Sequence, residues 1–203
     1  MKIFFVSVMI ALSLSVNAQI TDDFETNKMG WTEYSGKEGE VVIADGVMRM
    51  EGKKDAVSLW GFTTEPSFIL TSCYAPIDVT KDFEFSVDAS ARGMSDNNYI
   101  GIILDYIDDG NYIAFTVGKE GVALVRYHEY RLIGRKMAEI KKIKRSNAKN
   151  LNFKVKSSYQ KMEFYVNDMK ALEVRYLPLT SNGIGLYVYG KQKVQFDNMS
   201  IIQ

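Results

Sequence analysis

The sequence predicts an all-β protein of two packed antiparallel sheets, and two features of its residues carry this prediction. The first is the alternation of apolar and polar side chains in short segments, which is clearest at 83–90, 151–156, 162–166, 184–189 and 194–197. A period of two places successive side chains on opposite faces of a strand. The second feature is a set of short turn sequences between these segments, which is typical of antiparallel hairpins. Two packed sheets or a closed barrel can bury about a dozen strands, and the long early connections favour a jelly-roll sandwich.

The first eighteen residues have the pattern of a signal peptide. Lys2 precedes an apolar run at 3–14 that is too short to cross a bilayer, and small residues lead up to Ala18. We therefore expect cleavage near Ala18 and an exported protein in the periplasm, on the cell surface or outside the cell. Residues 1–18 are then the signal peptide, and 19–203 form one jelly-roll domain. An uncleaved membrane anchor is the alternative, and no later stretch is long enough for a transmembrane segment.

Composition and charge narrow the classes of partner. The chain has 25 basic and 25 acidic side chains, so it gives no electrostatic reason to expect nucleic acid. Its hydrophobic content of 46% is that of a folded protein. Cys73 is the single cysteine, which excludes an internal disulfide and is best explained as a small buried residue.

Each strand follows from local patterning. Asp45-Gly46 lies between segments 41–44 and 47–50, and this pair favours a type I′ hairpin because both central residues of that turn need positive φ. Asn167-Asp168 marks another turn. The remaining strands are expected at 56–60, 68–74, 83–90, 99–106, 112–117, 122–130, 151–156, 162–166, 172–176, 184–189 and from 194 onward.

The region 133–144 is the least clear in structure, and it lies within the most basic segment of the chain, 131–149. Met137, Ile140 and Ile143 are spaced three apart, which fits a helical turn or an irregular strand. The segment contains eight basic side chains and one acid. It forms either a solvated surface or a contact for an acidic glycan such as a uronate or sulfated polymer.

Four short pieces of the sequence carry a resemblance to a known family. They are 22–25 with 30–31, 98–105 with 111–115, 164–168, and 183–186 with 194–201. Together they resemble the concanavalin A-like jelly rolls, the laminin-G-like and glucanase-like sandwiches of secreted bacterial proteins. Asp168 stands where that family usually has glycine in a "fyVNG" hairpin. The resemblance covers nearly all of the chain after the leader, and it implies a protein that binds glycans, hydrolyses them, or accompanies enzymes that do.

The sequence lacks the E-x-D-x-x-E string of family 16 glycoside hydrolases. Its nearest candidate is Glu84 with Asp88, which alternation separates by about 13 Å, beyond the usual carboxylate pair. Asp105 and the acids of the 108–111 turn are closer, but turn chemistry explains that cluster. His128 is the only histidine, which excludes a multi-histidine zinc site, and nothing local supports a dyad with Cys73.

A structural calcium is implied by the resemblance. Related jelly rolls often hold this ion where the first and last strands meet near an early hairpin. Asp197 is then the side-chain ligand, and the carbonyl of Gly46 and a group near Asp23 or Glu25 complete the site. Calcium requires six to eight oxygen ligands.

Tyrosines supply the candidate ligand site. Tyr187 and Tyr189 have the parity opposite to Ile184, Leu186 and Val188, so both should point away from the core. They are either flat platforms on which sugars stack or tyrosines stabilised by cross-strand pairing. The further tyrosines expected on central strands are Tyr99, Tyr112, Tyr127 and Tyr130.

We therefore expect a non-catalytic protein that binds a polysaccharide or oligosaccharide on a concave aromatic face. The expected site residues are Tyr187, Tyr189, Tyr99, Tyr112 and Tyr127. One alternative is a glycoside hydrolase or lyase whose acids come from different strands. The other is a protein-interaction or structural module using the same sheet. Trp31 and Trp60 are expected to be core or rim anchors.

Overall fold

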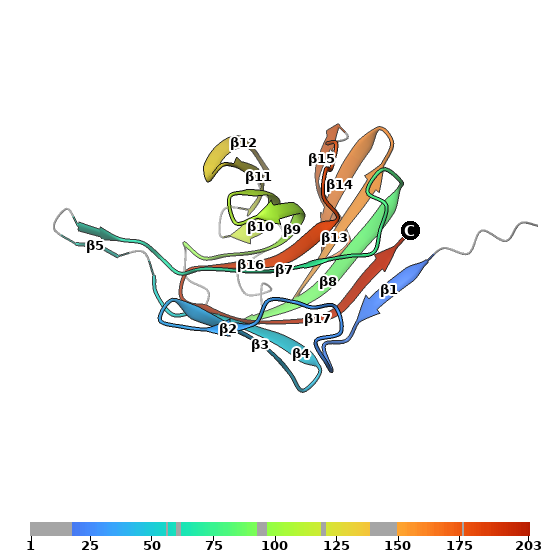
Figure 1. The fold of residues 1–203 in the computed structure, drawn as a ribbon. Helices are drawn as coiled ribbons and strands as arrows, with labels where there is room; N and C mark the ends of the chain where they lie inside the picture. Colours follow the sequence, from blue (N-terminus) through green and yellow to red (C-terminus); the bar gives the residue numbers. More distant parts are fainter. Residues whose placement is uncertain are drawn as a thin grey trace, which may run out of the picture.

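Two antiparallel sheets face each other, and a small two-stranded hairpin extends from one side (Figure 1). The computed structural model describes residues 18–55, 57–59, 62–92, 97–118, 121–138, 150–175 and 177–203. Among these residues there is no helix with the length and apolar character needed to cross a bilayer. The predicted all-β sandwich is confirmed.

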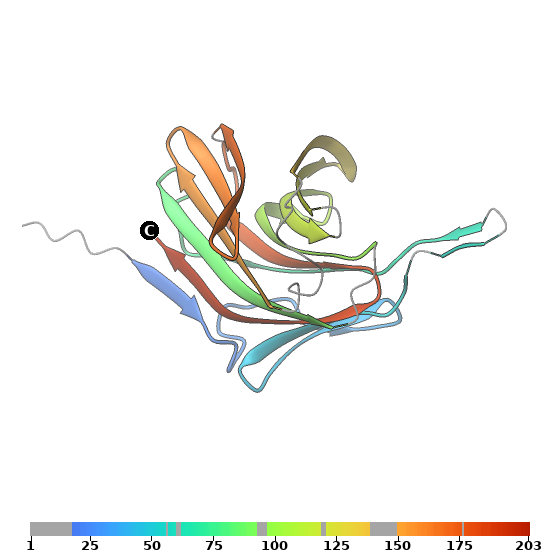
Figure 2. The ribbon, with the colours of Figure 1, turned by 180° about the vertical axis from the view of Figure 1, so that it is seen from behind.

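The larger sheet has nine strands in the order β15-β14-β13-β8-β17-β4-β3-β2, and β1 also pairs with β17 (Figure 2). The long last strand therefore has β8 on one side and β4 followed by β1 on the other. The strands are β1 (Gln19–Asp22), β2 (Tyr34–Ser35), β3 (Gly39–Ala44), β4 (Val47–Gly52), β8 (Phe83–Arg92), β13 (Asn150–Ser158), β14 (Lys161–Val166), β15 (Met169–Arg175) and β17 (Gln192–Ile202).

The second sheet has six strands in the order β12-β11-β10-β9-β16-β7. The small hairpin is β5 (Val57–Leu59) with β6 (Phe62–Thr64). The chain crosses between the two main sheets several times, and the shortest of these connections is Gly190-Lys191 between β16 and β17. The six strands are β7 (Phe68–Tyr74), β9 (Tyr99–Asp108), β10 (Asn111–Gly118), β11 (Gly121–His128), β12 (Arg131–Ala138) and β16 (Gly183–Tyr189).

The turn chemistry expected from the sequence is present. Asp45 and Gly46 have φ values of 55° and 72°, and they join β3 to β4 with Ala44 paired to Val47. Asn167 and Asp168 have φ values of 50° and 59° between β14 and β15. Both turns match the mirror-image hairpin type, whose twist fits that of the flanking strands. Asp168 adopts positive φ without being glycine, as Asp and Asn do more readily than other residues.

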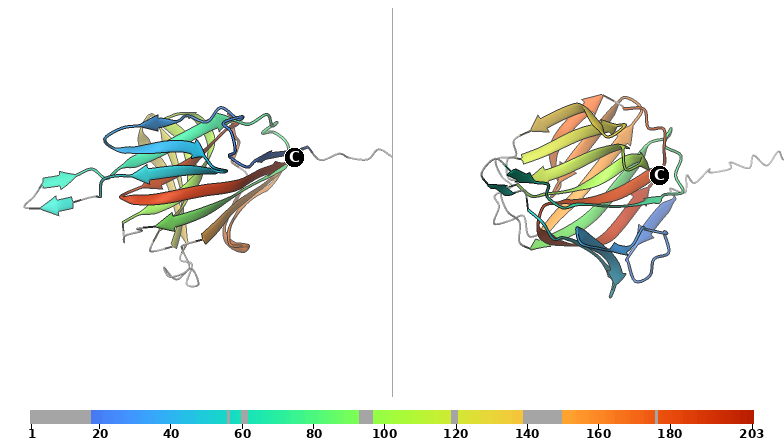
Figure 3. Two further views of the ribbon diagram at one scale, coloured as in Figure 1. Left: turned by 90° about the horizontal axis from the view of Figure 1, so that it is seen from below. Right: turned by 60° about the vertical axis from the view of Figure 1, so that its left-hand side comes forward.

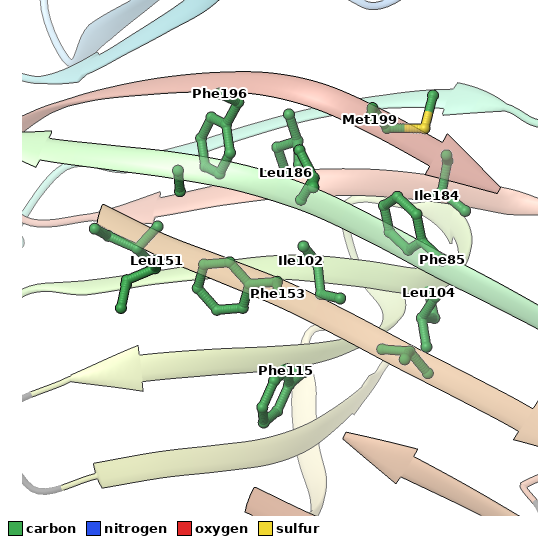
Figure 4. Close-up of a cluster of buried hydrophobic side chains, with 14 of the residues drawn as sticks. Phe85, Ile102, Leu104, Phe115, Leu151, Phe153, Ile184, Leu186, Phe196 and Met199 are labelled. Atoms are coloured by element: carbon green, nitrogen blue, oxygen red, sulfur yellow. The ribbon is translucent and has the colours of Figure 1, made fainter. Parts of the chain in front are cut away.

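One apolar layer lies between the sheets (Figure 4). Phe115 of β10 contributes from the six-stranded sheet, and its ring centroid lies 5.0 Å from that of Phe164 and 6.0 Å from that of Phe153. Both partners belong to the nine-stranded sheet, so these ring contacts join the two sheets. Phe85 and Phe196 belong to the same core, which confirms a single interior.

The structure decides between the two interpretations of the 133–144 segment as far as residue 138. Arg131–Ala138 is a strand that pairs with β11, and Met137 lies opposite Ala123. The helical-turn interpretation is therefore wrong at Met137, which lies in an exposed strand. Ile140, Ile143 and the predicted signal peptide before Ala18 lie outside the described residues, as does Trp60.

We expect Phe115→Ala to lower the free energy of unfolding by about 3–5 kcal/mol, because it removes a fully buried ring that joins the sheets. Urea denaturation of the domain measures this change. Tyr159→Ala is the matched control, since that side chain is 85% exposed and its loss should change stability by less than about 0.5 kcal/mol. Equal losses in the two variants would contradict the assignment of Phe115 to the core.

Candidate functional site

The outer face of the six-stranded sheet is aromatic, and strand alternation puts it there. On β16, Leu186 and Val188 point into the core, whereas Tyr187 and Tyr189 point to the opposite face. Tyr189 pairs with Tyr99 of β9, and Tyr187 pairs with Gly101. The right-hand view of Figure 3 looks toward this face of the sheet.

All five tyrosines expected at the site lie on this face. The rings of Tyr187 and Tyr189 are stacked with centroids 6.5 Å apart and an interplanar angle of 4°. Tyr99 adds to that pair, with its centroid 5.9 Å from that of Tyr189. Tyr112 and Tyr127 form a second stack at 5.0 Å. The face therefore carries two neighbouring groups of rings, and we call it the tyrosine face.

Burial divides these tyrosines into two buried rings and three accessible ones. Tyr112 and Tyr187 are only 4% and 9% exposed, whereas Tyr99, Tyr127 and Tyr189 are half-buried. Burial raises the pKa of Tyr187 well above its usual value, and it also raises the pKa of Tyr112 and Tyr189. These three hydroxyl groups are therefore protonated at any physiological pH and are available as donors.

Within the described residues, none of the five tyrosine hydroxyls donates a hydrogen bond to another protein group. By contrast, the hydroxyl of Tyr106 on β9 donates to Asp109 Oδ1 over 2.9 Å. A tyrosine on a sheet surface that leaves its donor unused can offer the ring face and the hydroxyl to the same ligand.

Sequence reasoning missed the part of this face that β7 contributes. Phe68 is 41% exposed, and its ring meets that of Tyr187 edge-on at 5.4 Å. Leu70 lies beside it, opposite Tyr187. Residues 68–74 are apolar at most positions, so the period of two is hidden and parity gives no signal. The pairing with β16, which is far away in the sequence, sets which side chains face out.

A cavity of about 320 Å³ lies along the β7 side of the tyrosine face. Phe68 and Leu70 form its apolar part, and Ser72, Tyr106 and Asp109 supply hydroxyl and carboxylate groups. Tyr34 of β2 closes it from the edge of the other sheet, and burial raises the pKa of its hydroxyl, with Asp109 adding to the shift. The cavity thus combines ring surface with hydrogen-bonding groups.

The carboxylates considered for catalysis are engaged elsewhere. Asp105 is buried, and its Oδ1 accepts hydrogen bonds from the main-chain nitrogens of Thr180 and Ser181 at 2.6 and 2.8 Å. Glu84 and Asp88 lie on the outer face of the nine-stranded sheet, away from the tyrosines. Glu84 forms an ion pair of 2.8 Å with a lysine of β13, and Asp88 accepts amide hydrogen bonds from Asn152 and Asn198.

At the corner where calcium is expected, the structure brings two of the expected oxygen groups near Gly46. A Cβ placed on Gly46 would lie 2.8 Å from Glu25 Oε1 and 3.8 Å from the Asp23 carbonyl oxygen, so both oxygens approach this turn. The Asp23 carboxylate instead lies 3.5 Å from a lysine and accepts from the Glu25 main-chain nitrogen. Asp197 follows Phe196, which pairs with Met48 two residues after the turn.

The oxygens at this corner fit calcium in kind, since they are carboxylate and main-chain carbonyl groups. Asp197 Oδ1 accepts a hydrogen bond of 2.6 Å from the Asn198 main-chain nitrogen, which leaves the second carboxylate oxygen of Asp197 as a potential calcium ligand. Among the described residues, no three acidic, histidine or cysteine side chains cluster as a metal site would require, so main-chain oxygens would have to complete the shell.

The two remaining reactive side chains do not meet. Cys73 is on β7 and His128 on β11, with β16, β9 and β10 between them, which places them about 19 Å apart at the usual strand spacing. Cys73 points into the core beside Ile184, whereas His128 is exposed at the end of its strand. Trp31 is likewise in the core, where its Nε1 donates to Asp22 over 2.9 Å.

No protein-family model matches the sequence, and neither does any curated protein. Solved structures do match. A β-glucanase of Bacillus licheniformis is 10% identical with a TM-score of 0.59, and the match covers 90% of this chain and 97% of that one. The carbohydrate-binding module CBM66 of Bacillus subtilis is 17% identical with a TM-score of 0.54, covering 85% and 95%.

A third match is the catalytic domain of an endo-1,3-β-glucanase from Thermotoga petrophila, at 9% identity and a TM-score of 0.59 over 94% of this chain and 99% of that one. All three are concanavalin A-like jelly rolls, and this chain has that fold. The resemblance noted in the sequence is thus confirmed for the architecture.

We expect Cys73 to resist thiol reagents in the folded protein. Burial raises the pKa of its thiol to about 12, with a contribution from Asp22, so at pH 8 only about one molecule in ten thousand carries the reactive thiolate. Titration with a chromogenic disulfide reagent should find no free thiol in native buffer and one in guanidinium chloride. Rapid reaction of the native protein would contradict the buried position of this side chain.

Proposed function

We propose that the protein is a non-catalytic carbohydrate-binding protein and that it binds a polysaccharide or oligosaccharide on the tyrosine face. The observation that carries the proposal is the set of half-buried rings of Tyr99, Tyr127 and Tyr189, beside the exposed ring of Phe68, on one rigid sheet. Sugars present faces of C–H groups and edges of hydroxyl groups. Flat rings with a polar end match both.

The cavity beside the rings supports the same proposal. Ligand sites in proteins combine apolar walls with a few fixed polar groups that set the ligand's orientation. Here Phe68 and Leu70 form the wall, and Ser72 and Asp109 offer a hydroxyl and a carboxylate to sugar hydroxyls. One sugar unit in the cavity and further units over Tyr187 and Tyr189 would follow the line from β7 to β16.

The absence of catalysis is proposed from the side chains at the centre of the face. The outward positions at the centre of β9 and β16 carry Tyr99, Gly101, Ile103, Gly185, Tyr187 and Tyr189, none of which is an acid. A glycosidase needs two carboxyl groups about 5–9.5 Å apart across the bond it cleaves. The similar structures include both glucanases and a carbohydrate-binding module, so the fold alone supports either function.

We also propose a structural calcium at the β3–β4 turn, held by the Glu25 carboxylate, the Asp23 and Gly46 carbonyl groups, and Asp197. The approach of Glu25 Oε1 and the Asp23 carbonyl oxygen to Gly46 supports it. Such an ion would join the first strand, this turn and the last strand, and it would add stability without taking part in ligand binding.

We expect Tyr189→Ala to weaken glycan binding at least about tenfold, because the most accessible ring of the stacked pair is lost. A glycan array with residues 19–203 identifies the ligand, and calorimetry then gives the affinities. Tyr189→Phe should stay within about threefold, since it keeps the ring. Tyr165→Ala on the nine-stranded sheet is the matched control and should bind normally.

Two results would count against this assignment. The first is an array on which the protein binds no glycan at high concentration. The second is a glycan that binds equally well to the protein and to Tyr189→Ala, which would place the site on another surface.

We expect calcium to raise the melting temperature by about 5 °C or more at a hundredfold excess over its Kd, because an ion that binds only the folded state stabilises it by mass action. Chelation should reverse the shift, and Glu25→Gln and Asp197→Asn should each reduce it. Glu38→Gln, in an exposed ion pair far from the turn, should keep the full shift. A melting temperature unaffected by calcium would exclude the site.

A further inference from the structure

The edge strand β12 of the six-stranded sheet is unusually exposed. Every side chain from Arg131 to Met137 is exposed, and three of them are large and apolar. These are Leu132, Ile133 and Met137, which are 49%, 57% and 46% exposed. Among the described residues the strand pairs only with β11, so β12 is an edge of the six-stranded sheet (Figures 1 and 2). An edge strand offers main-chain donors and acceptors to a further strand.

The other edges of the two main sheets are protected in ways that β12 is not. β2 and β1 are short, with two and four residues. The edge of β7 is covered by the chain at Thr32, whose main-chain nitrogen donates to the Ser72 carbonyl and whose carbonyl accepts from the Thr71 hydroxyl. Proteins commonly shorten or cover their edges in this way to avoid pairing with other chains.

The edge strand of the nine-stranded sheet is protected by charge. Lys170 of β15 forms ion pairs of 2.7 Å with Glu173 and 3.2 Å with Glu163. On β12, by contrast, all the charged side chains are basic. Lys136 donates to the main-chain carbonyl of Glu173, but Arg131 and Arg135 form no ion pair within the described residues.

We infer that β12 binds an extended acidic segment of another protein, which adds to the sheet as a seventh strand. Strand addition to an exposed edge takes affinity from main-chain hydrogen bonds and specificity from alternate side chains. The pairing of β12 with β11 fixes that alternation. Val125 lies opposite Arg135, Ala123 opposite Met137 and Tyr127 opposite Leu132, so these three β12 side chains share the tyrosine face.

The order of side chains along that face defines the partner. Along this face the apolar Leu132 is followed by the cationic Arg135 and then by the apolar Met137. A complementary strand therefore carries an acidic side chain between two apolar ones. The register shift in β12 lies at Ile133, which leaves residues 134–138 as the regular stretch. A partner segment of about five to seven residues covers it.

Charge selects this partner over a second copy of the chain. Two β12 strands paired with each other would bring three cations of each copy and no acid into one interface, which is unfavourable. An acidic polysaccharide would satisfy the cations, but it would leave the main-chain groups and the three apolar side chains unused. An acidic peptide strand uses all of them.

The test uses two peptides, Thr-Val-Thr-Glu-Thr-Val-Thr and the same peptide with Lys in place of Glu. Amide hydrogen exchange of residues 19–203, followed by NMR, should slow at alternate residues of β12 when the Glu peptide is added. Those amides are the ones that do not already bond to β11. The Lys peptide should bind at least about tenfold more weakly.

Arg135→Glu should reverse the preference between the two peptides, whereas Arg49→Glu, which makes the same charge change on β4 of the other sheet, should leave it unchanged. Retention of the native amide spectrum shows that each variant is folded. Three results overturn the inference. The first is that millimolar Glu peptide leaves the amide exchange of β12 unchanged. The second is that the protein binds polygalacturonate without added protection of the β12 amides, and the third is that the protein alone forms a dimer that Arg135→Glu dissociates.

Discussion

The burial of β16 on both faces is the constraint on which the candidate site depends. Leu186 and Val188 are fully buried in the layer between the sheets, and Tyr187 is almost fully buried on the other side. Because close-packed interiors resist displacement, a ring that lies on such a strand has a fixed height and tilt. A ligand that stacks on Tyr189 therefore meets a preorganised surface, which lowers the entropy cost of binding.

The two outer faces of the sandwich differ in chemistry, although the same alternation produces both. On the nine-stranded sheet the outward side chains neutralise one another. Lys161 and Lys170 lower the pKa of Glu163 to about 2, and Lys193 lies 3.0 Å from Glu51. Such a surface keeps its hydration and offers few flat apolar groups. The six-stranded sheet instead presents the stacked rings of the tyrosine face.

The strands and the tyrosine face could be predicted because both follow from local alternation. The parity of Tyr187 and Tyr189 relative to Leu186 sufficed to place them outside the core. Phe68 could not be assigned, because β7 is apolar at most positions and only its pairing with β16 shows which side chains face out. Tyr106 was missed for another reason. Asp105 has a φ of 52° at a register irregularity, which changes the parity of the strand after it.

The edge strand and the rings occupy one sheet without competing for the same atoms. β12 is separated from β16 by β11, β10 and β9, so a strand added at the edge would lie about 24 Å from Tyr187 and Tyr189. Coupling between two sites requires an element with two arrangements that both ligands bias. A sheet held by one apolar core on its inner face has a single arrangement. A glycan and an acidic peptide should therefore bind independently, and the protein would hold its protein partner at a fixed distance from the bound sugar.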